Sequence, residues 1–382
     1  MRHLRVPSRN TEATLRALRD AGWLLDGGRI LTDDDSDLRL IPLSQSAPES
    51  LPAPLDIWEI VSVEAPIPTP RSYRDYLTAF LSDEVVNAHS DWPIGHETMG
   101  DLIVVKLDEE IAEYGEAIAK AMLSQHARIR LVLRDDGVRG AFRVRSLTPL
   151  AARTEKGDIL GVSHISPDVS SATGLLSTRT QVKESGYSLH VDPGRAYFSS
   201  RLSTEREGTL AAAARLREVI GKPLRVCDPY AGAGPSLIPL LSQPDLVGEV
   251  FAADLNPDAV ELLDLNLQPF FDECGIDIDC CDATTLAARD EMRGNWDMLL
   301  VNIPHSTLDH LPAILPLLKE GSPTLLRAWA VIDEEAAESA EGKLRDLFSG
   351  QLNEEHGGLS IHPRRSYSTT QQLYRIEAWL HL

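Results

Sequence analysis

Apolar residues near the N-terminus recur first with a helical period and then with a strand period. Residues 1–22 form an amphipathic helical pattern, and we predict a helix over residues 11–25 with Thr11 as its cap. Residues 29–43 indicate two short strands joined by an acidic turn. Residues 1–60 therefore predict a small α/β domain.

The next segment, residues 44–70, is rich in Pro, Ser and Ala, which is typical of a linker. Residues 55–64 within it have the apolar content of a strand. No apolar run in the chain reaches the roughly 18 residues that a membrane span needs. We therefore expect a soluble, unexported, cytoplasmic protein that does not associate with membranes.

A second folded region alternates helical and strand periods and predicts a compact α+β domain over residues 71–182. We expect helices at residues 72–81 and 109–126, and strands at residues 100–107, 128–135 and 140–147. Residues 150–182 are polar, rich in Ser and Thr and without clear periodicity, so we expect a loop or an insertion there.

From residue 183 onward, short apolar runs alternate with helical segments in the manner of a parallel sheet. These runs lie within residues 224–241, 248–267, 276–286, 296–305, 323–332 and 372–380. The fold class is therefore α/β, with a Rossmann-like domain over residues 183–382 preceded by the two smaller domains.

Charge and cysteine content restrict the chemistry. The net charge of −21 argues against a nucleic-acid partner, but only seven of the 37 basic residues are lysine, and arginine suits bidentate contacts to phosphates and bases. The four cysteines show no C-x-x-C spacing, so we expect reduced thiols and neither a metal site nor a disulfide framework.

A loop of small residues follows the first apolar run of the last domain. The run ends at Asp228, and the loop Ala231–Gly234 opens a helix, so its backbone can approach a ligand at the carboxyl end of a strand. Pro235 disfavours a dinucleotide fingerprint, and the lysine of a phosphate-binding loop is missing. Both of these assignments are therefore disfavoured.

Polar residues also end the next three apolar runs. Asp254 is placed to accept hydrogen bonds from a ribose diol, Asp282 lies at a turn suited to an adenine amino group, and Asn302-Ile303-Pro304 follows the fourth run. Taken singly, each has an ordinary role as a cap, turn or strand end. Their order resembles that of class I S-adenosylmethionine-dependent methyltransferases.

The resemblance becomes closer in three stretches, HVDPGRAYFSSRLSTER at residues 190–206, DPYAGAGP at 228–235 and NIPH at 302–305. They resemble the archaeal and eukaryotic tRNA guanine-37 N1-methyltransferase family, which typically reads V-D-x-x-K-V-Y-F-S-P-R-L-S-T-E-R, D-x-F-A-G-V-G-P and N-L-P. Residues 4–43, 96–147 and 364–380 are similar to its N-terminal recognition domain, middle domain and closing strand region. The resemblance implies methyl transfer to N1 of guanosine 37.

The family chemistry assigns roles to five residues. Because N1 of guanine carries a proton at neutral pH, a base must remove it, and Glu205 aligns with the family's general base. A cation must face the charge that develops on O6, and Arg143 is our choice with Arg145 as the alternative. Asn302 and Pro304 are expected to hold the guanine edge and shape the pocket.

The resemblance also implies a cofactor and a partner. We expect Tyr197 or Phe198 to pack beneath the cofactor or the target base, with a place in the core as the alternative. We expect Arg201 and Arg206 to position an RNA phosphate or to flank the Glu205 carboxylate. The partner implied is the anticodon stem-loop of tRNA around position 37, with no obligate protein partner. For S-adenosylmethionine we expect contacts from Tyr197, Phe198, Arg201, Asp228, Tyr230, Ala231, Gly232, Gly234, Asp254, Leu255, Asn256, Asp282, Ala283 and Asn302.

Some positions depart from the family pattern and leave alternatives open. Arg195 replaces a lysine, Ser200 a proline, Ile303 a leucine, and His305 a basic residue. One alternative is a wyosine-type guanosine 37 derivative, through C7 methylation or aminocarboxypropyl transfer, although relatives with the latter activity lack the N-x-P motif. Others are a small-molecule methyltransferase and a non-catalytic tRNA-binding protein.

Overall fold

The computed structural model describes residues 1–25, 28–33, 35, 37–63, 72–140 and 142–382. The chain divides into two compact units, Met1–Ser72 and Tyr73–Leu382. The finer domain limits expected at residues 60, 71 and 182 stay predictions.

The first unit is a four-stranded sheet in the order β2-β3-β1-β4 with one helix, α1 (Thr11–Asp20). Its strands are β1 (Arg2–Pro7), β2 (Leu31–Thr32), β3 (Leu38–Pro42) and β4 (Glu59–Ser62), and all its pairings are antiparallel. Leu18 of α1 packs in one buried cluster with Leu4 and Val6 of β1. The strand pair in residues 29–43 and the strand within residues 55–64 are confirmed.

The helical pattern over the first residues was wrong, because residues 2–7 form the central strand of this sheet. Leu4 and Val6 are fully buried and point to the same face, with Arg5 between them, which is a strand period. Helix α1 begins only at Thr11, and its N-cap is Asn10, without a side-chain cap hydrogen bond. Thr11 is therefore the first helical residue and not the cap.

The second unit begins with a five-stranded sheet in the order β5-β6-β7-β8-β9. Helix α3 (Gly115–Gln125) crosses from β6 to its parallel neighbour β7 and buries Ile118, Met122 and Leu123. The strands are β5 (Glu97–Met99), β6 (Leu102–Val105), β7 (Leu131–Arg139), β8 (Val144–Arg153) and β9 (Ile159–Gly161); the 3-10 helices Tyr73–Ala79 and Glu109–Tyr114 and helix α2 (Asp83–Ala88) complete this part. The α+β arrangement of alternating helix and strand is as predicted.

The expectation of a loop over residues 150–182 was wrong. Strand β8 continues to Arg153, and β9, α4 (Pro167–Thr173) and β10 (Thr180–Glu184) follow. Ala151 and Ala152 are fully buried in β8, and residues this small carry a weak hydrophobic signal even where they face a core. Strand β10 pairs with β11 (Tyr187–Val191) in an antiparallel hairpin.

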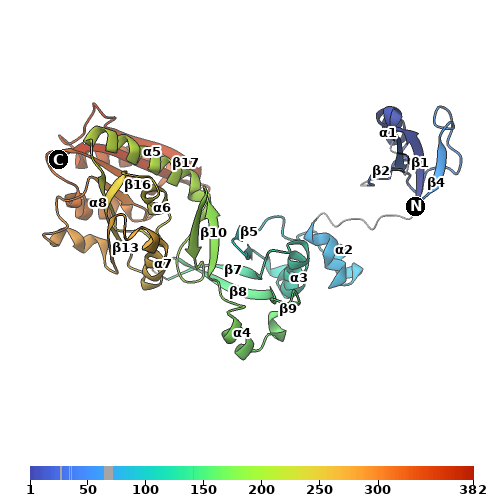
Figure 1. The fold of residues 1–382 in the computed structure, drawn as a ribbon, viewed down its shortest axis with the longest axis horizontal. Coiled ribbons are helices and arrows are strands. Elements are labelled where there is room, and N and C mark those ends of the chain that lie inside the picture. The colour runs from blue at the N-terminus through green and yellow to red at the C-terminus, as the bar shows by residue number, and fades with distance from the viewer. Residues whose placement is uncertain (26–27, 34, 36, 64–71, 141) are drawn as a thin grey trace. The chain divides into compact units, whose positions relative to one another are not determined.

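The remaining chain forms a seven-stranded sheet in the order β14-β13-β12-β15-β16-β18-β17 (Figure 1). The strands are β12 (Leu224–Asp228), β13 (Val247–Ala253), β14 (Gly275–Asp279), β15 (Met298–Val301), β16 (Pro323–Asp333), β17 (Leu359–Ser366) and β18 (Gln371–His381). The helices are α5 (Ser203–Ile220), α6 (Leu237–Leu241), α7 (Pro257–Leu267), α8 (Thr307–Ile314) and α9 (Ala337–Leu347). The expected α/β fold is confirmed.

Two details of this sheet differ from the sequence expectation. Strand β18 runs antiparallel to β16, and the unpredicted β17 pairs antiparallel with β18 at the edge.

Strand order reverses between β12 and β15, which are parallel neighbours. Because open α/β sheets bind ligands at such a switch point, beyond the carboxyl ends of the strands, the site is expected there.

Candidate active site

The loop after β12 has a backbone conformation that needs glycine at two positions. Gly232 and Gly234 have positive φ angles of 56° and 81°, and a Cβ on Gly234 would lie 2.8 Å from Leu263 Cδ1. The backbone N–H of Ala231 donates to Ala253 O over 2.8 Å, and that of Gly232 donates to Asp254 Oδ2 over 2.9 Å. The loop is thereby fixed to the end of β13, and any bulkier residue at Gly234 would collide with α7.

The two aromatic residues upstream of α5 lie in different surroundings. Tyr197 is half exposed, and its carbonyl oxygen is 3.9 Å from the place of a Cβ on Gly232, so it lies beside the glycine loop. Phe198 is buried, with the Arg206 guanidinium 5.2 Å from its ring centroid. Tyr197 can therefore contact a bound ligand, whereas Phe198 belongs to the core.

Two carboxyl groups beneath the loop form no ion pair within the described chain. Asp228 is buried and accepts one backbone N–H, from Tyr230 over 3.3 Å. Burial raises its pKa to about 7, and the Asp254 charge adds to the effect. Burial also raises the pKa of Asp254, although N–H groups of Asn256 and Gly232 oppose it. A ligand with a cationic group and hydroxyl donors, such as S-adenosylmethionine, would relieve both buried charges.

Replacing Asp228 with Asn is expected to stabilise the ligand-free protein and to weaken binding of a cationic ligand with hydroxyl donors, for which S-adenosylmethionine is the probe. Folding raises the pKa of Asp228 from 3.8 to about 7, so ionisation costs the folded state stability as pH rises through that window. At pH 8 the variant should gain on the order of a few kcal/mol, and the gain should vanish below about pH 4. Thermal unfolding across pH measures the change in stability, and calorimetric titration with S-adenosylmethionine measures the change in binding. Equal stability of the variant and the wild type at pH 8 would contradict this account.

The other strand-end residues divide into ligand-facing and structural positions. Leu255 is exposed at the end of β13. Asn256 is buried, caps α7 by accepting from Asp258 N over 3.1 Å, and donates to Arg195 O over 2.8 Å. Its amide therefore joins the segment before Tyr197 to α7 and is committed to the fold.

Asp282 acts as the N-cap of the 3-10 helix Ala283–Ala288. Its Oδ1 accepts from Thr284 N over 2.9 Å and from the Thr284 hydroxyl over 2.7 Å, and these hydrogen bonds hold the pKa of Asp282 below its usual value. Ala283 is buried behind it. Tyr230 lies beside this region, with its hydroxyl 2.8 Å from His310 Nδ1.

The Asn302-Ile303-Pro304 segment is anchored to the neighbouring strand. Pro304 O accepts from Val331 N of β16 over 2.7 Å, and the Thr307 hydroxyl donates to Trp329 O over 2.6 Å. Asn302 is half buried, and its side chain makes no hydrogen bond to any other residue that the structure describes. Its amide is therefore free to bind the edge of a ligand.

Glu205 lies in the first turn of α5, buried against the carboxyl end of β16. Its Oε2 accepts from Trp329 Nε1 over 3.1 Å and lies 3.6 Å from Arg375 Nη1, while Oε1 accepts from Arg364 Nε. Burial would raise the pKa of Glu205, but hydrogen bonds from Trp329 and Arg364 and the two arginine charges outweigh it and hold the pKa below its ordinary value. Glu205 is therefore an ionised carboxylate at neutral pH.

Trp329 and Thr307 together connect Glu205 to the Asn302–Pro304 segment. The Trp329 indole donates to the carboxylate, and the Thr307 hydroxyl lies 2.6 Å from Trp329 O and 2.9 Å from Ile303 O. The sequence did not single out Trp329, Arg364 or Arg375. In the sequence, Trp329 is indistinguishable from the other apolar residues of a buried strand. The only signal for Arg364 was its place in residues 364–380, which resemble the closing strand region of the family.

The two candidate arginines of the middle sheet have different partners. Arg145 pairs with Glu97 at 2.6 Å, and its Nη1 is buried without a hydrogen-bond partner in the described chain. Arg143 has a positive φ of 52° and donates to the Tyr367 hydroxyl over 3.0 Å. That hydroxyl is 2.9 Å from Nε2 of His305, the residue after Pro304. The structure thus links Arg143, and not Arg145, to the Asn302–Pro304 segment.

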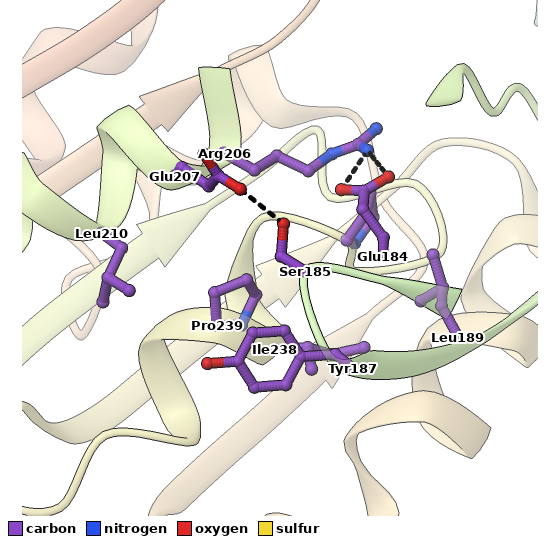
Figure 2. Close-up of a pocket in the computed structure, with 10 residues that line it drawn as sticks. Glu184, Ser185, Tyr187, Leu189, Arg206, Glu207, Leu210, Ile238 and Pro239 are labelled. Atoms are coloured by element: carbon purple, nitrogen blue, oxygen red, sulfur yellow. Dashed lines mark hydrogen bonds and ion pairs between the residues drawn. The ribbon is translucent and has the colours of Figure 1, made fainter. Parts of the chain in front are cut away.

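The two arginines that flank Glu205 in sequence also differ. Arg201 is exposed and forms no hydrogen bond or ion pair with another described residue. Arg206 is buried, pairs with Glu184 of β10 at 2.5 Å and donates to Ser199 O over 3.0 Å. Figure 2 shows this pair at the wall of a pocket between β10, β11, α5 and α6. The expectation that Arg206 brackets the acid or places phosphate was wrong.

Within the described residues, no helix is long and apolar enough to cross a membrane. The same part of the chain holds no group of three or more His, Cys, Asp or Glu side chains that could bind a metal ion.

Two family models match the second unit. Residues 73–154 match the TYW2 N-terminal domain, and residues 180–326 match the TRM5/TYW2 methyltransferase domain. The second match contains the glycine loop, Glu205 and Asn302, and ends within β16.

Curated proteins and solved structures show the same likeness. The Pyrococcus abyssi protein named tRNA (guanine(37)-N(1))-methyltransferase Trm5b is 26% identical over 69% of this chain and 67% of its own. An Arabidopsis thaliana protein named tRNA (guanine(37)-N(1))-methyltransferase 2 is 31% identical over 46% of this chain but only 23% of its own length.

Among solved structures, P. abyssi Trm5b has a TM-score of 0.64 at 20% identity, with all of both chains covered. The complex of aTrm5 with tRNALeu has a TM-score of 0.65 at 21% identity and covers 100% of this chain and 99% of that one. Pyrococcus horikoshii TYW2 in complex with MeSAdo has a TM-score of 0.57 at 17% identity, over 81% and 98%. At these identities the structural likeness shows the fold.

Proposed function

The chain belongs to the TRM5/TYW2 methyltransferase family, and from that premise we propose that it transfers a methyl group from S-adenosylmethionine to N1 of guanosine 37 in tRNA. The observation that carries this proposal is Glu205, a buried and ionised carboxylate connected through Trp329 to the Asn302–Pro304 segment. A base held beside a loop that can bind a nucleobase edge is what N1 methylation of guanine requires.

The residues around the glycine loop fit the cofactor. Asp228 and Asp254 offer buried negative charge, Gly232 offers close backbone approach, and the exposed Tyr197 and Leu255 can cover the bound molecule. S-adenosylmethionine, when bound, supplies an electrophilic methyl carbon on a sulfonium centre.

Glu205 has lone pairs left to accept the N1 proton. An ionised carboxylate has about four acceptor positions, and Trp329 and Arg364 donate to two of them. The lowered pKa keeps Glu205 charged at neutral pH, and the nearby Arg364 and Arg375 favour rapid loss of the proton once it has been accepted. Glu205 therefore acts as a transient proton acceptor.

Arg143 is the better candidate for the cation facing O6. Its contact with Tyr367, and through it with His305, brings its guanidinium to the residue that follows Pro304. Arg145 is already neutralised by Glu97. Asn302 has a free amide for the guanine edge, and Pro304 fixes the segment against β16 through its carbonyl.

Transfer RNA as the substrate is supported by the names of the relatives and by the complex of aTrm5 with tRNALeu. The exposed Arg201, next to the buried site, can contact a phosphate without losing an internal partner.

A second candidate is action on a wyosine-type derivative of guanosine 37. The match of residues 73–154 to the TYW2 N-terminal domain and the fold shared with P. horikoshii TYW2 favour it. Glu205 and the Asn302-Ile303-Pro304 motif favour methyl transfer to N1, because a ring nitrogen that carries a proton needs a base.

The proposal predicts strict dependence on the base at position 37. Unmodified tRNA transcripts with guanosine at 37 should accept labelled methyl groups and acquire a primer-extension stop at that position, because N1 methylation blocks base pairing. Transcripts with adenosine at 37 serve as the control and should remain unmethylated. Equal labelling of both transcripts, or labelling only of a wyosine-precursor tRNA, would contradict the proposal.

A further inference from the structure

A second cavity adjoins the Glu205 site through Arg375. It has a volume of about 400 Å³ and lies between α5 and the antiparallel edge strands β17 and β18. Arg375, which contacts Glu205, also lines this cavity, so the two share a wall. We name this cavity the edge basin.

The α5 wall of the edge basin is made of small residues. Gly208, Ala211 and Ala212 line it, and a Cβ on Gly208 would lie 2.7 Å from Arg327 Nη2. Larger side chains on this face of α5 would fill the space between the helix and β17. The volume of the basin is therefore a consequence of the residues on α5.

The basin is cationic in a chain whose net charge is −21. Three arginines and two histidines line it against one carboxylate, Glu377. Arg327 is committed to the fold, since it pairs with Glu377 at 2.5 Å and donates to Thr209 over 2.9 Å. Glu377 is thereby neutralised, and Arg375 shares the Glu205 carboxylate with Arg364. Arg215 has no carboxylate partner among the described residues.

Arg215 and Arg375 have donors to spare. Arg215 is exposed, makes one hydrogen bond to His356 O over 3.2 Å, and lies with its guanidinium 5.2 Å from the Trp379 ring centroid, which orients it. Arg375 Nε is buried without an acceptor among the described residues. A buried donor without an acceptor is costly. Because Arg375 also lines the basin, an anionic ligand there can accept from its guanidinium group.

We propose that the edge basin binds a backbone phosphate of the RNA next to the nucleotide that reaches Glu205. This inference rests on the proposed function and extends it to the path of the RNA strand. The strongly negative chain repels a polyanion, so phosphates can dock only where cations gather locally. Arg375 joins the basin to Glu205, so an RNA backbone that lies in the basin runs from Arg215 toward Arg375 and the carboxylate. Ser360 and His362 add polar groups to the same wall.

Arg215→Gln tests this proposal, because the side chain is exposed and its loss leaves the fold intact. Binding of unmodified tRNA should weaken roughly five- to tenfold, and the slope of log affinity against log salt should become shallower by about 1. Affinity for S-adenosylmethionine and the melting temperature should stay as in the wild type. His362→Ala provides a second variant in the basin and should weaken tRNA binding in the same direction.

The matched control is Arg217→Gln, which removes the same charge from the same helix. Arg217 lies two residues further along α5, outside the basin, and donates to Asp245 O. Equal effects of the Arg215 and Arg217 substitutions on affinity and salt slope would overturn the proposal, since they would show a general charge effect.

Three further results would test the basin proposal and separate it from the proposed function. If Arg215→Gln lowers affinity for inorganic phosphate but leaves tRNA binding unchanged, the basin holds a free anion and the RNA proposal is wrong. If the wild type neither binds nor methylates tRNA, both the proposed function and the proposal that the basin binds RNA are wrong. If the wild type methylates guanosine 37 and both basin variants bind tRNA normally, only the basin proposal fails.

Discussion

Replacing Glu205 by Gln is expected to lower the single-turnover rate of methyl transfer to guanosine 37 by about 10²- to 10⁴-fold, the usual contribution of a general base. Glutamine keeps the shape of the side chain but cannot accept the N1 proton. Affinity for S-adenosylmethionine should change little, because the carboxylate contacts Trp329, Arg364 and Arg375 and none of the glycine-loop residues. Rapid-quench assays with saturating cofactor measure this rate.

Glu207→Gln is the matched control for this experiment. Glu207 lies on the same helix, is exposed, and accepts from the Ser185 hydroxyl over 2.7 Å, away from the Glu205 network. It should methylate tRNA at close to the wild-type rate. Because the Glu205→Gln substitution would leave Arg364 and Arg375 without a counter-charge, the melting temperature must be followed in parallel. A Glu205→Gln enzyme that folds and turns over at the wild-type rate would exclude Glu205 as the base.

Replacing Arg143 by Ala is expected to lower the rate of transfer by about 10²- to 10³-fold, as when one donor to a developing negative charge is removed. In the proposed mechanism the guanidinium faces the charge that builds on O6 when N1 loses its proton. Arg145→Ala is the discriminating comparison, because Arg145 pairs with Glu97 and should affect mainly stability. Rates measured at saturating tRNA separate loss of catalysis from loss of binding.

A larger loss of rate in Arg145→Ala than in Arg143→Ala would contradict this assignment. The structure would then need a rearrangement in which Arg145 leaves Glu97 and reaches the base. Such a rearrangement could give an acceptor to the buried Nη1 of Arg145, which has none in the described chain.

The cofactor half of the site could be predicted from sequence because its residues are close together along the chain. Asp228, Gly232 and Gly234 follow one strand, and Asp254 ends the next, so strand period and turn chemistry were enough to bring them to one sheet edge. The proposed roles of these residues in binding the cofactor stay predictions.

The part of the site around Glu205 could not be predicted in this way. Glu205 was found by family resemblance, but its partners Trp329, Arg364 and Arg375 come from three strands between 124 and 170 residues further along the chain. Their meeting depends on β18 folding back antiparallel to β16 and on β17 pairing antiparallel with β18, which no local pattern specifies. The same limit explains why Arg206 was misassigned, since its partner Glu184 lies on a hairpin, β10 and β11, that the sequence pattern did not predict.

The central claim is that the Glu205 carboxylate takes the proton from guanine N1 while Arg143 faces O6. The most direct measurement is the pair of distances from Glu205 to N1 and from Arg143 to O6 in a crystal structure with S-adenosylhomocysteine and a tRNA that has guanosine at position 37. We predict both distances at about 2.6–3.2 Å, within hydrogen-bond reach. A bound guanine whose N1 faces another side chain, with Glu205 still paired only to Trp329 and Arg364, would contradict the account.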